Sequence, residues 1–292
     1  MFIDTLMQCL VYCPLILGIF LSFKLLRLTD LTADGSFVLG AGLYARLTLE
    51  ELPYFACIFI GIFGGFCVGL VLAYIQKNNR VPSIVASILC VFMLYSINLL
   101  VMGRPNISLL YHETSFWKLV EYSSLCANTL LLTIVTLIVV AFLGLVKSKW
   151  GLTLRAFGFN YNLTKRQGYF PERIRSLGLG LSNALYATSG VLCVHVQRFA
   201  DITMGQGIAL IGIGSVIIGL QLFITLGLID SDRFRGGHEV IACGVGIFLY
   251  FFLMNILLSF SLDPLYLKLV LGLLLTFVFT CKIKGLSHAN YY

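Results

Sequence analysis

Eight apolar runs constrain this chain more than any other feature, because each is long enough to cross a lipid bilayer as a helix. A helical crossing needs about 20 predominantly apolar residues. Hydrophobic residues make up 59% of the sequence and charged residues 11%, whereas soluble domains carry about 25% charged residues. The sequence therefore excludes a soluble globule and predicts an all-α polytopic membrane protein. The eight runs are residues 6–23, 52–75, 81–102, 123–146, 177–196, 207–229, 240–260 and 265–281.

A ninth stretch, residues 28–49, differs because its first half is polar. It becomes apolar only from Phe37 onward, so its apolar half is too short to span a bilayer alone. This pattern predicts an unwound segment that leads into a half-helix, with Asp34 or Ser36 able to cap that helix. We therefore expect one transmembrane domain over residues 1–292, with about eight full transmembrane helices plus one broken or half helix.

The connection at residues 147–176 indicates the orientation of the chain. Seven of its residues are basic and one, Glu172, is acidic, and loops rich in Lys and Arg stay in the cytoplasm. Alternating outward from this loop places the C-terminal tail, with Lys282 and Lys284, in the cytoplasm. The N-terminus is expected outside if residues 28–49 cross the membrane and inside if they re-enter. Only Asp4 is charged before Lys24, so no signal peptide is predicted.

Asp30 and Asp34 are the most informative acidic residues. A carboxylate at bilayer depth costs about 2.5–3.5 kcal/mol on insertion scales, so water or helix-end N–H groups must solvate it. One interpretation is an element of a solute path or gate, since irregular backbone occurs in membranes where it lines a cavity. The other is an ordinary cytoplasmic loop followed by a capped helix. The residues alone leave both open.

Small and polar residues inside the runs indicate how the helices pack. Gly61, Gly65 and Gly69 share one helix face and predict a close-packed seam. Polar residues such as Asn98, Ser182 and Asn183 could line one central path. Each could equally form a hydrogen bond to a neighbouring helix, a contact worth about 0.6 kcal/mol.

The motifs of several catalytic classes are missing from the sequence. There is no HExxH, GxSxG or Walker A motif, and the four histidines lie on different segments. The nine cysteines form no CxxC pair, so no metal site and no cofactor are predicted. The formal charge of +7 is dispersed between apolar runs, which argues against nucleic acid as a partner. We expect a chain without covalent chemistry, so energy for uphill transport would come from an ion gradient or a partner ATPase.

The cytoplasmic connection contains a segment suited to docking. Residues 160–167 can form a short basic helix, Gly168 can end it, and Pro171 can turn the chain toward the next span. The alternative is a solvated loop that simply obeys the positive-inside rule.

Several short motifs, in order along nearly the whole chain, resemble the permease subunits of bacterial ABC importers. The similarity is to the branched-chain amino-acid and ribose permease superfamily, and within it to the tryptophan/tyrosine-type uptake permeases. The motifs are LTADGSFVLG at 31–40, LYSIN at 94–98, MGRPN at 102–106, LRAFG at 154–158, LSNAL at 181–185, FAD at 199–201 and IIG at 217–219.

The resemblance implies a transport subunit of the bacterial cytoplasmic membrane that is not itself an enzyme. Its implied partners are a second copy of itself, cytoplasmic ATPase subunits and an extracytoplasmic solute-binding protein. Residues 160–166 would be the coupling helix that docks on the ATPase, and Gly168 matches the glycine of its signature. The coupling residues are then Asn160, Thr164, Lys165, Arg166 and Gly168.

The resemblance also implies a solute path along the homodimer axis. The residues expected to line it are Asp30, Asp34, Ser36, Asn98, Ser182 and Asn183. By analogy with the subgroup, the solute would be a small molecule such as an aromatic amino acid. The alternative is a secondary transporter driven by an ion gradient, with Asp30 or Asp34 as the ion site. An intramembrane enzyme would need a clustered nucleophile and base, which the sequence lacks.

Overall fold

The computed structural model describes residues 2–77, 80–110, 124–229 and 237–259, together with Leu269, Gly272, Leu273 and Thr276. The predicted run at 265–281 therefore lies outside the described residues, apart from those four. Seven described segments are long and apolar enough to cross a membrane, which confirms the all-α polytopic class. The elements, in chain order, are α1 (Phe2–Ile19), η1 (Phe20–Leu25), α2 (Ala33–Leu49), α3 (Tyr54–Ile75), α4 (Ser83–Met102), β1 (Asn106–Ser108), α6 (Ser124–Lys147), α7 (Lys149–Phe159), α8 (Tyr161–Arg166), α9 (Pro171–Gln197), β2 (Phe199–Asp201), η3 (Ile202–Gly205), α10 (Ile208–Thr225) and α11 (Gly237–Ser259).

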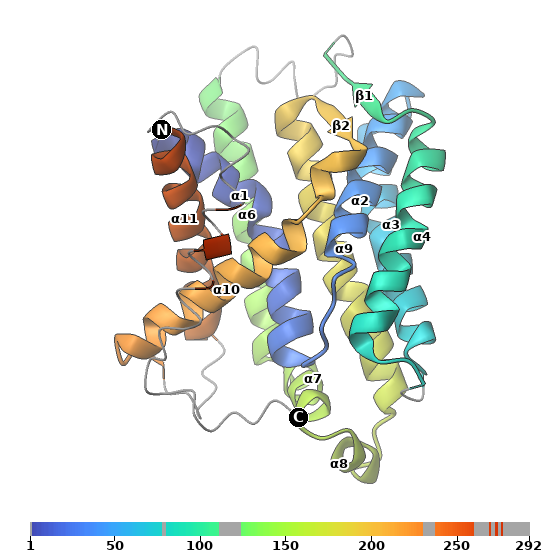
Figure 1. Cartoon of the computed structure of the whole chain (residues 1–292), viewed down its shortest axis with the longest axis vertical. Coiled ribbons are helices and arrows are strands. Elements are labelled where there is room, and N and C mark those ends of the chain that lie inside the picture. Colours follow the sequence, from blue (N-terminus) through green and yellow to red (C-terminus); the bar gives the residue numbers. More distant parts are fainter. Residues whose placement is uncertain are drawn as a thin grey trace.

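The predicted broken helix is present, and it crosses the molecule. α1 runs from the end where the N-terminus lies toward the end that carries α7 and α8 (Figure 1), and its last turn is the π-helix η1. The chain then turns back in an irregular segment, residues 26–32, and α2 begins about halfway up the molecule and continues to the N-terminal end (Figure 1). Residues 26–49 as a whole therefore run from the α7–α8 end of the molecule to its N-terminal end (Figure 1).

The predicted cap of α2 is wrong. The cap residue is Thr32, and its side chain makes no capping hydrogen bond. Asp34 accepts hydrogen bonds from the start of α10, and the Ser36 hydroxyl donates to Asn183. Both side chains therefore connect α2 to other helices.

The longest helix, α9, starts six residues earlier than the predicted run. Pro171 stands in its first turn, where its fixed φ suits a helix start, and Glu172 lies where the helix dipole favours a negative charge. Its 27 residues span about 40 Å at 1.5 Å per residue, whereas the hydrocarbon core measures about 30 Å. Arg173 and Arg175, expected in the loop, thus belong to the first turns of this helix.

The predicted glycine seam is confirmed, and it joins α3 to α9 within the chain. A Cβ atom on Gly69 would lie 2.2 Å from the Leu179 carbonyl oxygen, and one on Gly65 would lie 2.5 Å from the Asn183 carbonyl oxygen. Because lipid provides no hydrophobic drive between helices, such close backbone packing is a main source of their association. α9 also packs on α1 and α2, so it lies at the centre of the bundle (Figure 1).

A substitution in this seam tests its importance. Gly69→Ala should destabilise the protein by about 1–3 kcal/mol, the usual cost of overpacking, because the new methyl group meets backbone atoms that cannot rotate away. The measurement is the thermal unfolding temperature of the purified protein in detergent. Gly144→Ala in α6 is the matched control, since a Cβ there has nothing within 4 Å. Equal unfolding temperatures for Gly69→Ala and the wild type would contradict the seam.

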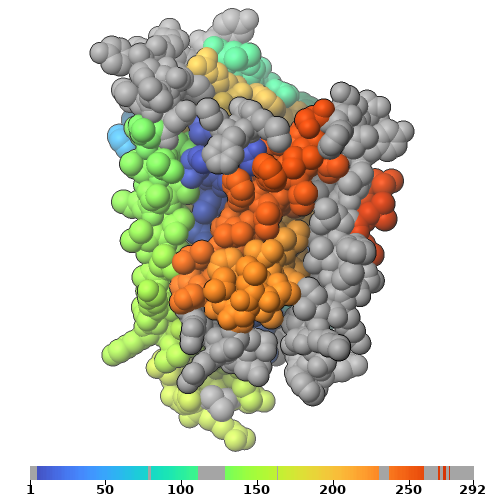
Figure 2. Space-filling view, turned by 90° about the vertical axis from the view of Figure 1, so that its left-hand side faces the viewer, coloured from blue at the N-terminus to red at the C-terminus, as the bar shows by residue number. Residues whose placement is uncertain are grey.

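At the end opposite α8, β1 and β2 form an antiparallel pair with Ile107 opposite Ala200 (Figure 1). The Asn106 amide donates to the Asp201 carboxylate over 3.0 Å, and hydrogen bonds from Thr203 hold the pKa of Asp201 below its usual value. This pair ties the end of α4 to the end of α9. The face formed by α6, α10 and α11, with α1 between them, is shown in Figure 2.

Candidate functional site

A buried polar network surrounds the start of α2. Asp30 is 3% exposed, and Thr32, Ser36 and Asn183 are fully buried. The Thr32 amide donates to Asp30 Oδ1 over 2.9 Å, and the Thr32 hydroxyl also contacts this oxygen. Asn183 Nδ2 on α9 donates to Asp30 Oδ2 over 3.2 Å. The ordinary-loop interpretation of Asp30 therefore fails, because its carboxylate is enclosed by helices.

Asn183 is the centre of this network. Its Oδ1 accepts from Ser36 Oγ over 2.6 Å and lies 2.8 Å from Thr32 Oγ1, and its Nδ2 also donates to the Leu179 carbonyl. The Tyr186 hydroxyl, one turn further along α9, interacts with the Asp30 carboxyl and lies 2.9 Å from Ser22 Oγ. The network thus joins three elements: η1, the start of α2 and the middle of α9.

Asp34 connects two helix starts. Its carboxylate accepts hydrogen bonds from the backbone N–H groups of Gly207 (3.1 Å) and Ala209 (2.7 Å) at the beginning of α10. A negative charge is favoured there because the first N–H groups of a helix lack partners and the helix dipole is positive. For Asp34, the expectation that helix-end N–H groups solvate the carboxylate is confirmed. Asp34 therefore holds the start of α2 against the start of α10.

Replacing Asp34 should loosen this contact. Asp34→Ala removes both acceptors from the start of α10, and losing a capping side chain costs about 0.5–2 kcal/mol. We expect a lower thermal unfolding temperature and faster proteolysis near residue 207. Asp34→Asn keeps one acceptor oxygen and should lie between Asp34→Ala and the wild type. An Asp34→Ala protein as stable as the wild type would contradict the capping role.

The two remaining predicted path residues lie outside the network. Asn98 on α4 is 2% exposed, and its Nδ2 donates to the Gly35 carbonyl of α2. Its Oδ1 has no hydrogen-bond partner among the described residues. The Ser182 hydroxyl donates to the Gly178 carbonyl of its own helix over 3.0 Å. The structure therefore brings together Asp30, Ser36 and Asn183, with Asp34 nearby, and separates Asn98 and Ser182 from them.

The five predicted coupling residues lie on a projection beyond the helix bundle, formed by α7 and α8 (Figure 1). Asn160, Lys165, Arg166 and Gly168 are exposed, but Thr164 is fully buried and its hydroxyl donates to the Asn160 carbonyl. Gly168 adopts a φ of +83°, which favours glycine, and it follows the end of α8 as predicted. Thr164 thus shapes the segment, while the other four are available to a partner.

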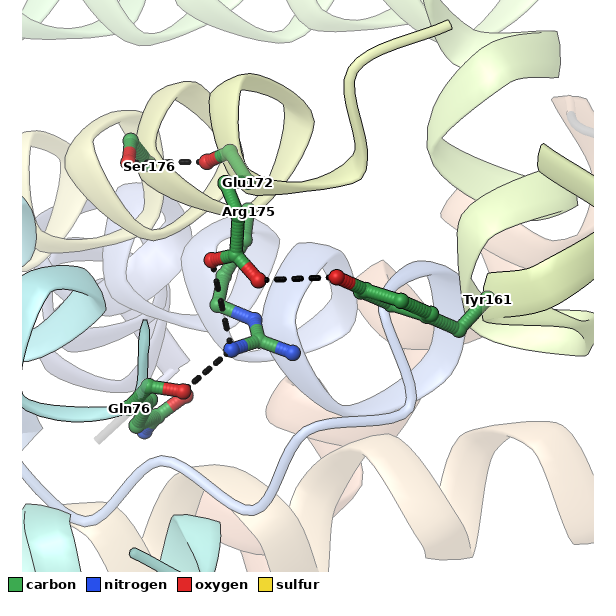
Figure 3. Close-up of polar contacts among 5 residues, drawn as sticks. All are labelled: Gln76, Tyr161, Glu172, Arg175 and Ser176. Atoms are coloured by element: carbon green, nitrogen blue, oxygen red, sulfur yellow. Dashed lines mark hydrogen bonds and ion pairs between the residues drawn. The ribbon is translucent and has the colours of Figure 1, made fainter. Parts of the chain in front are cut away.

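The sequence interpretation missed a set of partly buried contacts where α8 meets α9. Tyr161 donates to Glu172 Oε1 over 3.0 Å, and Arg175 lies 3.5 Å from Glu172 Oε2 (Figure 3). Arg175 is 3% exposed and also donates to the Gln76 carbonyl at the end of α3. Its position among seven basic residues concealed it. A useful signal was its place after Pro171, since a helix starting there puts Arg175 in the second turn.

The chemistry of these sites is hydrogen bonding and charge compensation. No group of three or more His, Cys, Asp or Glu side chains suited to a metal ion occurs in the described part of the chain. The polar atoms around Asp30 belong to hydroxyl, amide and carboxyl groups that bond to one another between helices. Such an arrangement can hold helices in one relative position and can exchange partners when they move. The described part of the chain is therefore a polytopic membrane protein with a buried polar network at the start of α2 and a basic segment that projects from the bundle.

Comparisons with known proteins identify the class. The family model described as branched-chain amino acid transport system / permease component matches residues 1–279. An uncharacterized protein of Rickettsia prowazekii (strain Madrid E), RP368, is 42% identical over 282 residues, covering 97% of each chain. A tyrosine transport system permease protein of Clostridioides difficile (strain R20291) is 30% identical over 273 residues, covering 94% of this chain and 88% of the relative. No solved structure matches this chain.

The fold and the comparisons together define a membrane permease, a transport subunit and not an enzyme. The chain belongs to the family of permease components of branched-chain amino acid transport systems.

Proposed function

We propose that this permease is the membrane subunit of an ATP-driven ABC importer that carries a small solute into the cytoplasm. The observation that carries the proposal is membership of the family over residues 1–279. The projecting α7–α8 segment supports it, because exposed Lys165 and Arg166 offer a basic surface to a soluble partner. Its partners would be cytoplasmic ATPase subunits, a second copy of the chain and an extracytoplasmic solute-binding protein. In the proposed orientation, α8 and the C-terminus lie in the cytoplasm of a bacterial cell.

The proposed solute is an amino acid with an aromatic side chain. This assignment rests on similarity to the tyrosine transport system permease protein. The proposed path passes the start of α2, and its residues are Asp30, Asp34, Ser36, Asn98, Ser182 and Asn183. In the described conformation these side chains are bonded within the protomer, so passage would require the network around Asn183 to open.

The alternative is a secondary transporter that uses Asp30 or Asp34 as an ion site. The bonding of these acids argues against it, because Asp34 already accepts two backbone N–H groups and Asp30 accepts bonds from Thr32 and Asn183. Both carboxylates therefore already have hydrogen-bond donors within the protein.

The decisive experiment combines two measurements. Tagged protein purified from its own cells should retain an ABC ATPase at a fixed ratio, and the uptake of radiolabelled tyrosine should stop when ATP is depleted. Uptake that survives ATP depletion but fails when the proton or sodium gradient collapses would support the secondary transporter instead. A retained ATPase without tyrosine uptake would preserve the ABC assignment and remove the solute assignment.

A further inference from the structure

One contact of the projecting segment reaches the irregular segment that carries Asp30. Gly158 near the end of α7 lies against the turn after η1, since a Cβ there would lie 2.2 Å from the Leu25 carbonyl oxygen and 3.0 Å from the Leu26 carbonyl carbon. The next residue, Phe159, lies beneath the Arg27 guanidinium, 4.0 Å from ring centroid to Cζ. Arg27 adopts a φ of +53°, which non-glycine residues seldom adopt, and it precedes Asp30 by three residues.

A second contact reaches α9, the helix that carries Asn183. Tyr161 on α8 donates to Glu172, and Glu172 pairs with Arg175 (Figure 3). The Arg175 guanidinium carbon Cζ also lies 5.6 Å from the ring centroid of Phe157 and 5.8 Å from that of Tyr161. Burial raises the pKa of the Tyr161 phenol, and its hydrogen bond to Glu172 raises it further, so the phenol keeps its proton at neutral pH. Arg175 precedes Asn183 by eight residues on one unbroken helix, about 12 Å along its axis.

The two segments that α7 and α8 contact are joined to each other further along the bundle. Arg27 lies three residues before Asp30, and Arg175 lies eight residues before Asn183. The side chains of Asp30 and Asn183 are hydrogen-bonded to each other. A close-packed helix moves as a unit because its side chains interdigitate without voids. Movement of α7 and α8 would therefore reach both sides of the Asp30–Asn183 contact.

We propose that Arg27, Phe159, Tyr161 and Arg175 form a two-armed connection through which the cytoplasmic segment opens and closes the Asp30–Asn183 contact. One arm is Arg27 on Phe159, and the other is Tyr161 with Glu172 and Arg175. These are positioning residues that act through Asp30 and Asn183. The inference rests on the proposed function, because it assigns to a partner ATPase the force that moves α7 and α8.

The test uses one mild variant in each arm. Tyr161→Phe removes only the hydroxyl that donates to Glu172. Arg27→Asn removes the guanidinium and keeps a residue that tolerates a positive φ. The matched controls are Tyr169→Phe, an exposed tyrosine in the same connection, and Lys77→Asn, an exposed basic residue at the end of α3. Each protein is purified with its ATPase and reconstituted into liposomes with the binding protein and radiolabelled tyrosine.

We expect both arm variants to retain the ATPase at the wild-type ratio and to unfold at the wild-type temperature. Solute carried per ATP hydrolysed should fall about fivefold in each, the factor that one hydrogen bond or cation–π contact supplies, and the controls should match the wild type. A merely structural role would not lower this ratio in a complex that stays assembled and stable.

Two results would overturn the connection. One is an unchanged ratio in either arm variant, and the other is loss of the ATPase from Tyr161→Phe, which would make that tyrosine a docking residue. Failure of the proposed function is distinguished by the wild-type protein, which would then purify without an ATPase.

Discussion

Deleting residues 160–167 is expected to abolish both ATPase association and solute uptake while the chain still inserts into the membrane. The deletion removes α8 and the exposed Lys165 and Arg166, but it leaves every described candidate span intact. The measurements are co-purification of the ATPase, uptake of radiolabelled tyrosine, and the amount of tagged chain in the membrane fraction. We expect association and uptake at background and a membrane amount close to that of the wild type.

Substitutions at Gly168 serve as the finer version of this experiment. Gly168→Arg should also abolish association, because it strains a residue with a φ of +83° and adds a bulky side chain beside α8. Gly168→Asn tolerates the same φ and should retain much of the wild-type association. An ATPase that stays bound to the deleted chain would remove α8 from the docking surface.

Replacing Asn183 by Leu should produce the largest effect on stability and uptake of any change inside the membrane. The Ser36 hydroxyl would lose its acceptor and Asp30 would lose the amide that donates to it. Leaving buried polar groups unpaired should lower the free energy of unfolding by about 3 kcal/mol. The measurements are the thermal unfolding temperature in detergent and the initial rate of tyrosine uptake, which should fall to background.

Thr188→Val, on the same helix, is the matched control. Its hydroxyl donates to the Ala184 carbonyl over 2.7 Å, so within the described residues its removal breaks a bond inside α9 and leaves no side chain of another helix unpaired. We expect its unfolding temperature and uptake to match those of the wild type. If Asn183→Leu behaved like Thr188→Val, the network would have no role in holding α2 against α9.

The fold class could be predicted because membrane insertion depends mainly on apolar length. Most expected runs correspond to a helix, and the polar string after Leu28 predicted the break before α2. Helix ends were less accurate, and α9 begins at Pro171 and not at 177, because the rule that assigns basic residues to loops ignores a buried arginine. The spacing of residues in the sequence predicts a packing contact only where small residues repeat on one helix face, as Gly61, Gly65 and Gly69 do.

The site could be predicted in part. Asp30, Asp34 and Asn183 could be recognised because acidic and amide side chains are unfavourable inside a membrane. Their residue types did not show which helix each side chain would contact. Asp34 bonds to Gly207, which lies 173 residues away, and no local pattern reveals such a contact. Arg175, Tyr161 and Tyr186 stayed hidden because an arginine in a basic loop and tyrosines in an apolar chain are unremarkable by composition. The translocation path and the coupling residues stay predictions until transport is measured.

The helices α2 and α10 begin within an apolar layer, and their starts give acidic residues in a membrane permease a structural role. Each start presents N–H groups that have no carbonyl partner within the helix, and hydrocarbon cannot supply one. Carboxylates beside facing helix starts therefore satisfy an architectural need before any solute arrives. In other permeases with paired interrupted helices, an acid at this place is by itself no sign of ion coupling.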